Sequence, residues 1–159
     1  MEQKTLSNWL KFILVGVGIC GLVVYGGFIP MYGKEVALMN PEYAYCYIPW
    51  LLFLWGTGIP CCVGLILGWK IADNIGKDRS FSQENARLFQ WISILAALDT
   101  AFFFLMNIIY LFCGMNHPGI VLYAMFIVFA GVAVTIVAAV LSCLVRKAAG
   151  LQTQSDLTI

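Results

Sequence analysis

Charged side chains are scarce in this chain of 159 residues, because Asp, Glu, Lys and Arg together make up only 11%. Apolar residues account for 62%, and the mean hydropathy is +0.89. These polar groups are too few to cover the surface of a soluble globular protein. We therefore expect lipid to solvate much of the chain. The formal net charge of only +1 provides no basic surface for DNA or RNA, and we expect no direct nucleic-acid binding.

Histidine and the sequence motifs of enzymes are also nearly absent. The single histidine, His117, has no second metal ligand near it in the sequence, and its place beside Pro118 is typical of a polar turn. We find no Ser–His–acid set, no HExxH helix, no phosphate-binding glycine loop and no pair of carboxylates at one depth. The sequence therefore predicts neither an enzyme nor a metal site nor a bound cofactor.

The six cysteines form no redox or metal motif. Cys61 and Cys62 are adjacent, whereas a dithiol oxidoreductase needs two residues between its cysteines. Cys46 and Cys113 are both expected at the outer edge of the membrane, where an oxidising environment could join them. This disulfide is a candidate if the two Cα atoms come within reach of each other, and two free thiols are the alternative.

Four long apolar segments are what the chain does contain, at about residues 12–31, 48–71, 88–113 and 120–145. Each is long enough to cross a hydrocarbon layer of ~30 Å, which needs ~20 residues of helix. Trp and Tyr residues gather near the segment ends, as amphipathic rings do at membrane interfaces. We predict an all-α fold in which residues 1–159 form a single membrane domain, an integral membrane four-helix bundle with a tail at 146–159.

The basic residues indicate which way the chain is inserted. If the N-terminus lies inside the cell, Lys34 is the one basic residue of nine that falls outside. The eight others are Lys4, Lys11, Lys70, Lys77, Arg79, Arg87, Arg146 and Lys147. Because such asymmetry over short loops orients helices during insertion, we expect both termini to be cytoplasmic.

Small residues recur every four positions along the second span. They are Gly56, Pro60, Gly64, Gly68 and Ala72, and the fourth span has a similar series at Gly131, Thr135, Ala139 and Cys143. Small side chains let helix backbones approach closely where no hydrophobic force drives association in lipid. We favour a tight contact between spans two and four, and a seam within a homo-oligomer is the alternative.

Asp99 lies near the middle of the third span and hence near the bilayer centre. An ionised carboxylate is costly there and no basic residue lies at that depth to pair with it, which favours the neutral acid as a hydrogen-bond donor. Pro60 has no amide hydrogen for the Gly56 carbonyl, so that carbonyl needs another donor. The predicted polar intramembrane site comprises Asp99, Asn107, Thr57, Thr135, Gly56 and Pro60. It could be a packing clasp, a proton or cation site, or a contact with a basic residue of another membrane protein.

The loop between spans two and three and the end of the tail are the candidates for binding a partner. Ser82, with Glu84 in the first turn after it, predicts an N-cap for the third helix. Apolar residues alternate beside the terminal carboxylate, a pattern that suits capture by a groove or sheet edge. The predicted partner-binding residues are Arg79, Phe81, Ser82, Glu84, Asn85, Arg87, Asp156, Leu157, Thr158 and Ile159. A simple turn and a frayed end are the alternatives.

Three short runs carry a resemblance to a known family. They are the loop run at 81–85, the run at 141–148 that ends the fourth span, and the last four residues, 156–159. These runs and the four-span layout resemble the bacterial membrane family catalogued as domain of unknown function 2975. The Gln and Ser residues just before Asp156 depart from the acidic residues expected at that place. The resemblance implies a multi-pass protein of the bacterial cytoplasmic membrane and offers no catalytic residues to transfer.

Members of that family are commonly encoded beside a small helix-turn-helix protein, so the resemblance also implies a cytoplasmic DNA-binding partner. We therefore expect a non-enzymatic membrane sensor or anchor that regulates this partner. One alternative is a small oligomeric transporter or channel that uses Asp99, and the other is an accessory subunit of a larger membrane complex.

Overall fold

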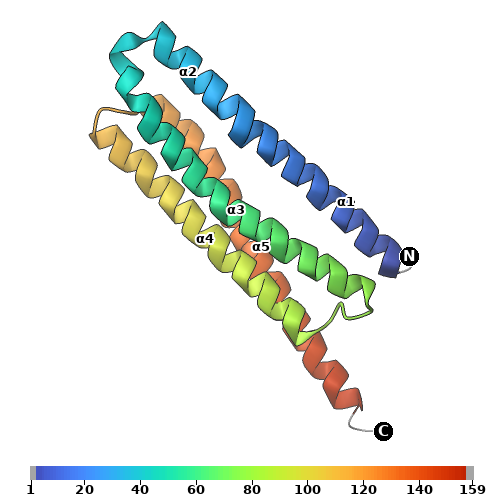
Figure 1. Cartoon of the computed structure of the whole chain (residues 1–159). Coiled ribbons are helices and arrows are strands. Elements are labelled where there is room, and N and C mark those ends of the chain that lie inside the picture. Colours follow the sequence, from blue (N-terminus) through green and yellow to red (C-terminus); the bar gives the residue numbers. More distant parts are fainter. Residues whose placement is uncertain (1–2, 157–159) are drawn as a thin grey trace.

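The computed structural model describes residues 3–156, including all of their side chains except those at 153, 155 and 156. In chain order the elements are α1 (Gln3–Leu22), the π-helical segment η1 (Val23–Phe28), α2 (Ile29–Met39), the 3₁₀ segment η2 (Pro41–Cys46), α3 (Tyr47–Gly76), α4 (Gln83–Phe112) and α5 (Pro118–Asp156). Four stretches are long and apolar enough to cross a membrane, namely Gln3–Met39, Pro41–Gly76, Gln83–Phe112 and Pro118–Gln152. The all-α, four-span prediction is confirmed (Figure 1).

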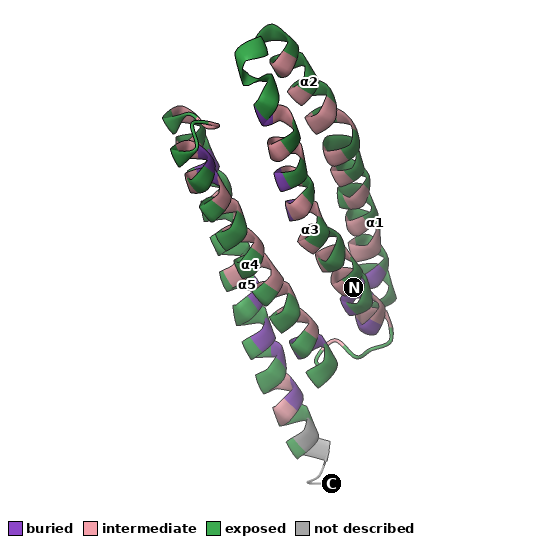
Figure 2. Cartoon of the chain, turned by 60° about the vertical axis from the view of Figure 1, so that its left-hand side comes forward, coloured by how far each residue is buried: buried purple, intermediate pink, exposed green. Residues whose placement is uncertain are grey.

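The four long helices pack as an open row. Within the described residues, α1 packs on α3, α3 on α4, and α4 on α5, whereas α3 makes no contact with α5. Figure 2 shows the α1–α3 and α4–α5 pairs standing side by side, with few buried residues between them. The predicted tight contact between spans two and four is therefore wrong.

The small residues of α5 serve its contact with α4. A Cβ atom at Gly131 would collide with the Thr100 side chain of α4. Ser93 Oγ donates a hydrogen bond of 3.0 Å to the Thr135 carbonyl, and thus crosses from α4 to α5. The small residues of α5 thus lie at a close helix contact, as expected of small residues in membranes. The helix that they contact is α4 and not α3.

The small residues of α3 face two different neighbours. A Cβ atom at Gly68 would lie 3.1 Å from Leu14 of α1, and one at Gly56 would lie 3.6 Å from Phe102 of α4. Ala72 also meets α1, because its carbonyl accepts a hydrogen bond of 2.6 Å from Ser7 Oγ. The small residues of α3 therefore face α1 near its end and α4 nearer its middle, and they let both helices approach closely.

The first long helix continues well past its predicted end near residue 31. It passes through η1 and α2 as far as Met39, and η2 follows. Most of residues 32–47, which the sequence places between the first two spans, are therefore helical. Gly33 lets α2 lean on α3, since a Cβ atom there would lie 2.8 Å from the Tyr47 ring. We call the end away from both termini, where α2 and η2 lie, the far end (Figure 1). Aromatic residues of α2, η2 and α3 gather there.

The opposite end of the row, which we call the terminal end, holds the start of α1, the α3–α4 loop and the end of α5 (Figure 1). Ser82 caps α4 there by accepting a hydrogen bond of 3.1 Å from the Asn85 backbone N–H, so the predicted N-cap is confirmed. Asp78 adopts a positive φ of 56° in the preceding turn, a conformation that aspartate tolerates better than most residues. At 39 residues, α5 is about 58 Å long and extends beyond the start of α4.

Candidate functional site

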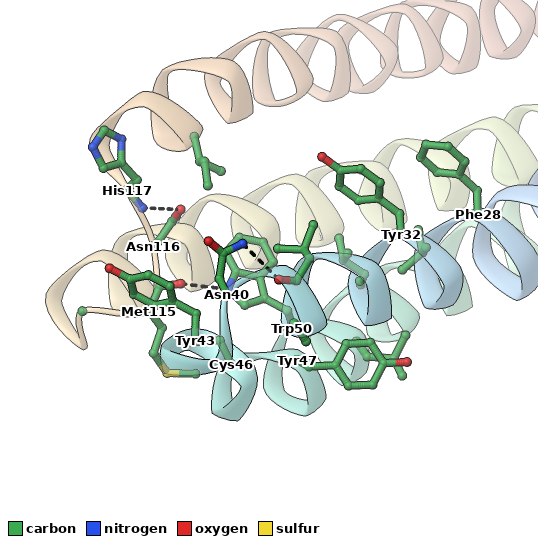
Figure 3. A pocket seen from close by; sticks show the side chains of 18 residues that line it. Phe28, Tyr32, Asn40, Tyr43, Cys46, Tyr47, Trp50, Met115, Asn116 and His117 are labelled. Carbon is green, nitrogen blue, oxygen red and sulfur yellow. Dashed lines mark hydrogen bonds between the residues drawn. The ribbon is translucent and has the colours of Figure 1, made fainter.

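The far end contains a cavity of about 560 Å³. It lies between α2, η2, the first turns of α3 and the α4–α5 turn, so segments distant in sequence build it together (Figure 3). Five aromatic side chains line it, namely Phe28, Tyr32, Tyr43, Tyr47 and Trp50. Its volume falls within the range of small-molecule pockets, about 300–1,000 Å³. We call it the far-end pocket.

Hydrogen bonds to backbone carbonyls fix the walls of the far-end pocket. Trp50 Nε1 donates to the Met115 carbonyl at 2.9 Å, which ties α3 to the α4–α5 turn. The Tyr110 hydroxyl of α4 donates to the Pro49 carbonyl at 3.0 Å, and its ring centroid lies 5.3 Å from that of Trp50. The pocket wall on the side of α3 and α4 is therefore joined at two points.

Asn107 supports the α4–α5 turn rather than the middle of the membrane. Its side chain is 1% exposed, and Asn116 Nδ2 donates to both its carbonyl and its Oδ1 at 3.2 Å. Asp99 lies eight residues away, or about 12 Å along the helix, which is too far for the two side chains to bond. Thr135 also lies apart, because it contacts α4 through Ser93. The predicted polar site is thus divided.

A second polar group lies where η1 crosses α3. The Thr57 hydroxyl donates to the Leu54 carbonyl at 2.7 Å, so its one hydrogen is used and the Tyr25 hydroxyl, 3.1 Å away, is the donor to Thr57. Trp55 Nε1 donates to the Tyr25 carbonyl at 3.0 Å. Both partners of Tyr25 come from α3, and the π-helical turn that carries it is a type often found at functional sites.

Asp99 lies beside this group without joining its hydrogen bonds. The Tyr25 hydroxyl and the Cys61 thiol are close enough to interact electrostatically with its carboxyl. Its Oδ1 is buried and has no hydrogen-bond partner within residues 3–156. The predicted bond to the Gly56 carbonyl is absent from the described residues, although Gly56 lies against Phe102 of α4. Sequence reasoning missed Tyr25, whose one signal was a tyrosine in the middle of a span instead of at its end.

The candidate disulfide is not formed. Cys46 is buried in η2 and Cys113 is exposed at the end of α4, and both are free thiols, as are the other four cysteines.

The terminal end is closed by a buried pair of amides. Asn74 Nδ2 of α3 donates to Asn85 Oδ1 of α4 at 2.9 Å. Asn85 Nδ2 in turn donates to the carbonyls of Arg79 and Ser80, at 3.2 and 3.1 Å. Asn85 is fully buried, so it holds the loop in shape and is not part of the surface that a partner could touch.

Four other predicted partner-binding residues do form an exposed surface, which we call the loop face. They are Arg79, Phe81, Glu84 and Arg87. Phe81 is 59% exposed and does not dock on the start of α4. The predicted tail residues, the Asp156 side chain and 157–159, lie outside the described part of the chain.

Ion pairs next to the loop face hold α1 against α3. Asp73 lies 3.0 Å from Lys11 Nζ and 2.7 Å from Lys77 Nζ, and the Lys11 ammonium is also 5.4 Å from the Trp69 ring centroid. Ser80 Oγ adds a hydrogen bond of 3.0 Å to Gln3 Oε1. The α3–α4 loop and the start of α1 are therefore joined.

The comparisons with known proteins agree with this architecture. A family model described as "Protein of unknown function (DUF2975)" matches residues 31–159. The chain belongs to this family. The Bacillus subtilis (strain 168) protein named "Uncharacterized membrane protein YoaS" is 27% identical to this DUF2975 chain over 160 residues, which cover 99% of each protein. No solved structure matches the chain.

Proposed function

We propose that this protein is a non-enzymatic sensor in the bacterial cytoplasmic membrane, and that it regulates a cytoplasmic helix-turn-helix DNA-binding protein. The far-end pocket would receive the signal, and the loop face at the terminal end would pass it on. One observation carries the proposal: a single helix, α3, reaches from one region to the other. Its first turns place Tyr47 and Trp50 in the pocket, and its last turn places Asn74 against Asn85.

The open row gives this helix a way to move. The α1–α3 and α4–α5 pairs pack on each other along α3 and α4, because neither α1 nor α2 packs against α4 or α5 in the described chain. Tyr25 of η1 also lies near Asp99 of α4. A ligand in the far-end pocket lies between the two pairs, so it acts on the angle between them. It can shift that angle only if it binds one arrangement more tightly than the other.

The loop face has a composition that suits a protein partner. An exposed aromatic ring, Phe81, lies between two arginines in sequence, Arg79 and Arg87, and aromatic and arginine side chains are enriched at interface hot spots. The positive-inside asymmetry supports a cytoplasmic terminal end. The family resemblance stated above supports a helix-turn-helix protein as the partner.

A crosslinked pull-down from native membranes tests the partner. The full chain should retain a small DNA-binding protein, and Phe81→Ala should lose most of it. Phe126→Ala is the matched control, because Phe126 is 74% exposed on the membrane-spanning part of α5 and far from the loop face. A chain truncated after Lys147 measures the contribution of the tail. Recovery of no soluble protein with any of these forms would contradict the proposed regulation of a cytoplasmic partner.

Asp99 favours a second candidate function, a small oligomeric transporter or channel. A buried carboxyl oxygen without a partner in the middle of a span is a feature of proton and ion pathways. Proton flux into liposomes that contain the purified protein, lost in Asp99→Asn, would support this candidate. Stable copurification of a larger membrane protein would instead support the role of an accessory subunit.

A further inference from the structure

The far-end pocket has a predominantly aromatic and aliphatic wall. The rings of Phe28 and Tyr32 are parallel, with an interplanar angle of 4° and centroids 5.7 Å apart. Both line the pocket from the first long helix, and Tyr47 and Trp50 line it from α3 (Figure 3). A flat apolar wall of this kind suits a hydrocarbon chain or a ring system, which gains from leaving water or competing lipid.

No charged side chain among the described residues lines this pocket. The charges of the far end, Lys34, Glu35 and Glu42, are all exposed and lie outside the lining. A carboxylate or phosphate group in the pocket would lose hydration without gaining an opposite charge, which is costly. The lining therefore disfavours an anionic ligand.

The rim offers free hydrogen-bond donors to a ligand. His117 Nδ1 accepts a hydrogen bond of 3.1 Å from the Gly119 backbone N–H, so the neutral ring carries its proton on Nε2. Nε2 makes no hydrogen bond within the described chain, and neither do the hydroxyls of Tyr32 and Tyr43 in the lining. The amide groups of Asn40 and Asn116 donate to the Val36 and Asn107 carbonyls. A ligand that presents an acceptor can therefore bind at the rim.

We expect the pocket to open toward the lipid. Residues of α2 and Ile120 of α5 both line it, yet α2 and α5 make no contact with each other. Ile120 is 49% exposed. A molecule dissolved in the surrounding leaflet can therefore enter between α2 and α5 without passing through water.

We propose that the far-end pocket binds one uncharged amphiphile from the surrounding lipid leaflet, with its hydrocarbon chain along the aromatic wall and an acceptor oxygen of its head group on His117 Nε2. This inference deepens the proposed function, because it names the ligand class of the sensor. The contacts that carry it are the stacked Phe28 and Tyr32 rings, the uncharged lining and the free histidine donor.

Photo-crosslinking tests the occupant. The purified full chain in phosphatidylcholine nanodiscs is irradiated with monooleoylglycerol that carries a diazirine on its acyl chain, and the labelled peptides are mapped. Labelling should concentrate in residues 28–54 and 114–120. Unlabelled monooleoylglycerol should compete at least about tenfold better than oleate, because the carboxylate loses hydration in the pocket.

Matched variants separate the pocket from the lipid-facing surface. Ala37→Trp should fill the pocket and abolish the competable labelling, since Ala37 lines it. Leu38→Trp should leave labelling unchanged, because Leu38 is 81% exposed and is not part of the lining. His117→Phe should keep labelling in the same segments, but unlabelled monooleoylglycerol should compete more weakly, because its head-group oxygen loses the Nε2 donor.

Three results would overturn the proposal: labelling spread evenly over the lipid-facing helices, equal labelling of Ala37→Trp, or equal competition by oleate. The nanodiscs contain no partner protein. Specific labelling together with a negative pull-down would thus reject the regulator and keep the ligand site, and the reverse combination would reject the ligand class alone.

Discussion

The two ends of the molecule are joined in opposite ways. At the terminal end, α3 and α4 meet through amide side chains that are almost fully buried, Asn74 at 6% and Asn85 at 0% exposed. At the far end, α3 and the α4–α5 turn border a cavity of about 560 Å³, and hydrogen bonds from Trp50 and Tyr110 hold α3 to that turn and to α4. One end is therefore fixed by buried amides and the other can admit a ligand, which is the asymmetry that a sensor needs.

The largest loss of stability is expected from breaking the fixed end. Asn85→Ala removes the partner of the buried Asn74 Nδ2 and the donor to two partly buried loop carbonyls. Leaving buried polar groups unsatisfied costs about 1–3 kcal/mol. Thermal unfolding in detergent should show a clear fall in Tm, and Glu84→Ala, an exposed neighbour, should leave Tm nearly unchanged. Equal Tm values for the two variants would show that this end is not the fixed one.

A smaller effect is expected at the far end. Trp50→Phe keeps an aromatic ring in the wall but removes the hydrogen bond to the Met115 carbonyl, which should cost about 1 kcal/mol. We expect faster hydrogen exchange at residues 114–117 and a modest fall in Tm, smaller than that of Asn85→Ala. A fall larger than that of Asn85→Ala would reverse the comparison of the two ends.

The smallest effect is expected from the ion pairs that hold α1 at the terminal end. Asp73→Asn removes the charge that Lys11 and Lys77 share, but all three side chains are partly exposed and water screens them. The Tm should change little in low salt, and the change should vanish in high salt. A large change that persists in high salt would mean that these charges are part of the buried joint.

Length and local pattern were enough to predict the spans and the cap. The four apolar segments and Ser82 before α4 depend only on neighbouring residues, and both predictions are confirmed. Which helices pair could not be predicted in this way. A series of small residues predicts that another helix approaches closely, but it does not identify that helix. In the structure, Gly131 of α5 lies against Thr100 of α4 and not against α3.

The candidate site was harder to predict because its parts are far apart in the chain. The far-end pocket combines residues near 28–54 with residues 114–120, and no periodicity within one helix reports that meeting. Tyr25 was missed because tyrosine is ordinarily a residue of membrane interfaces. Asn107 was assigned to the Asp99 site by helix face alone, although about 12 Å of helix rise separates the two.

Hydrogen–deuterium exchange of the full chain in nanodiscs, with and without monooleoylglycerol, tests most directly whether α3 couples the two ends. The account predicts slower exchange at residues 28–54 and a change of exchange rate at residues 77–87, with both effects lost in Ala37→Trp and kept in Leu38→Trp. Protection of the pocket segments with no change at residues 77–87 would contradict it, because the ligand would then bind without any effect on the loop face.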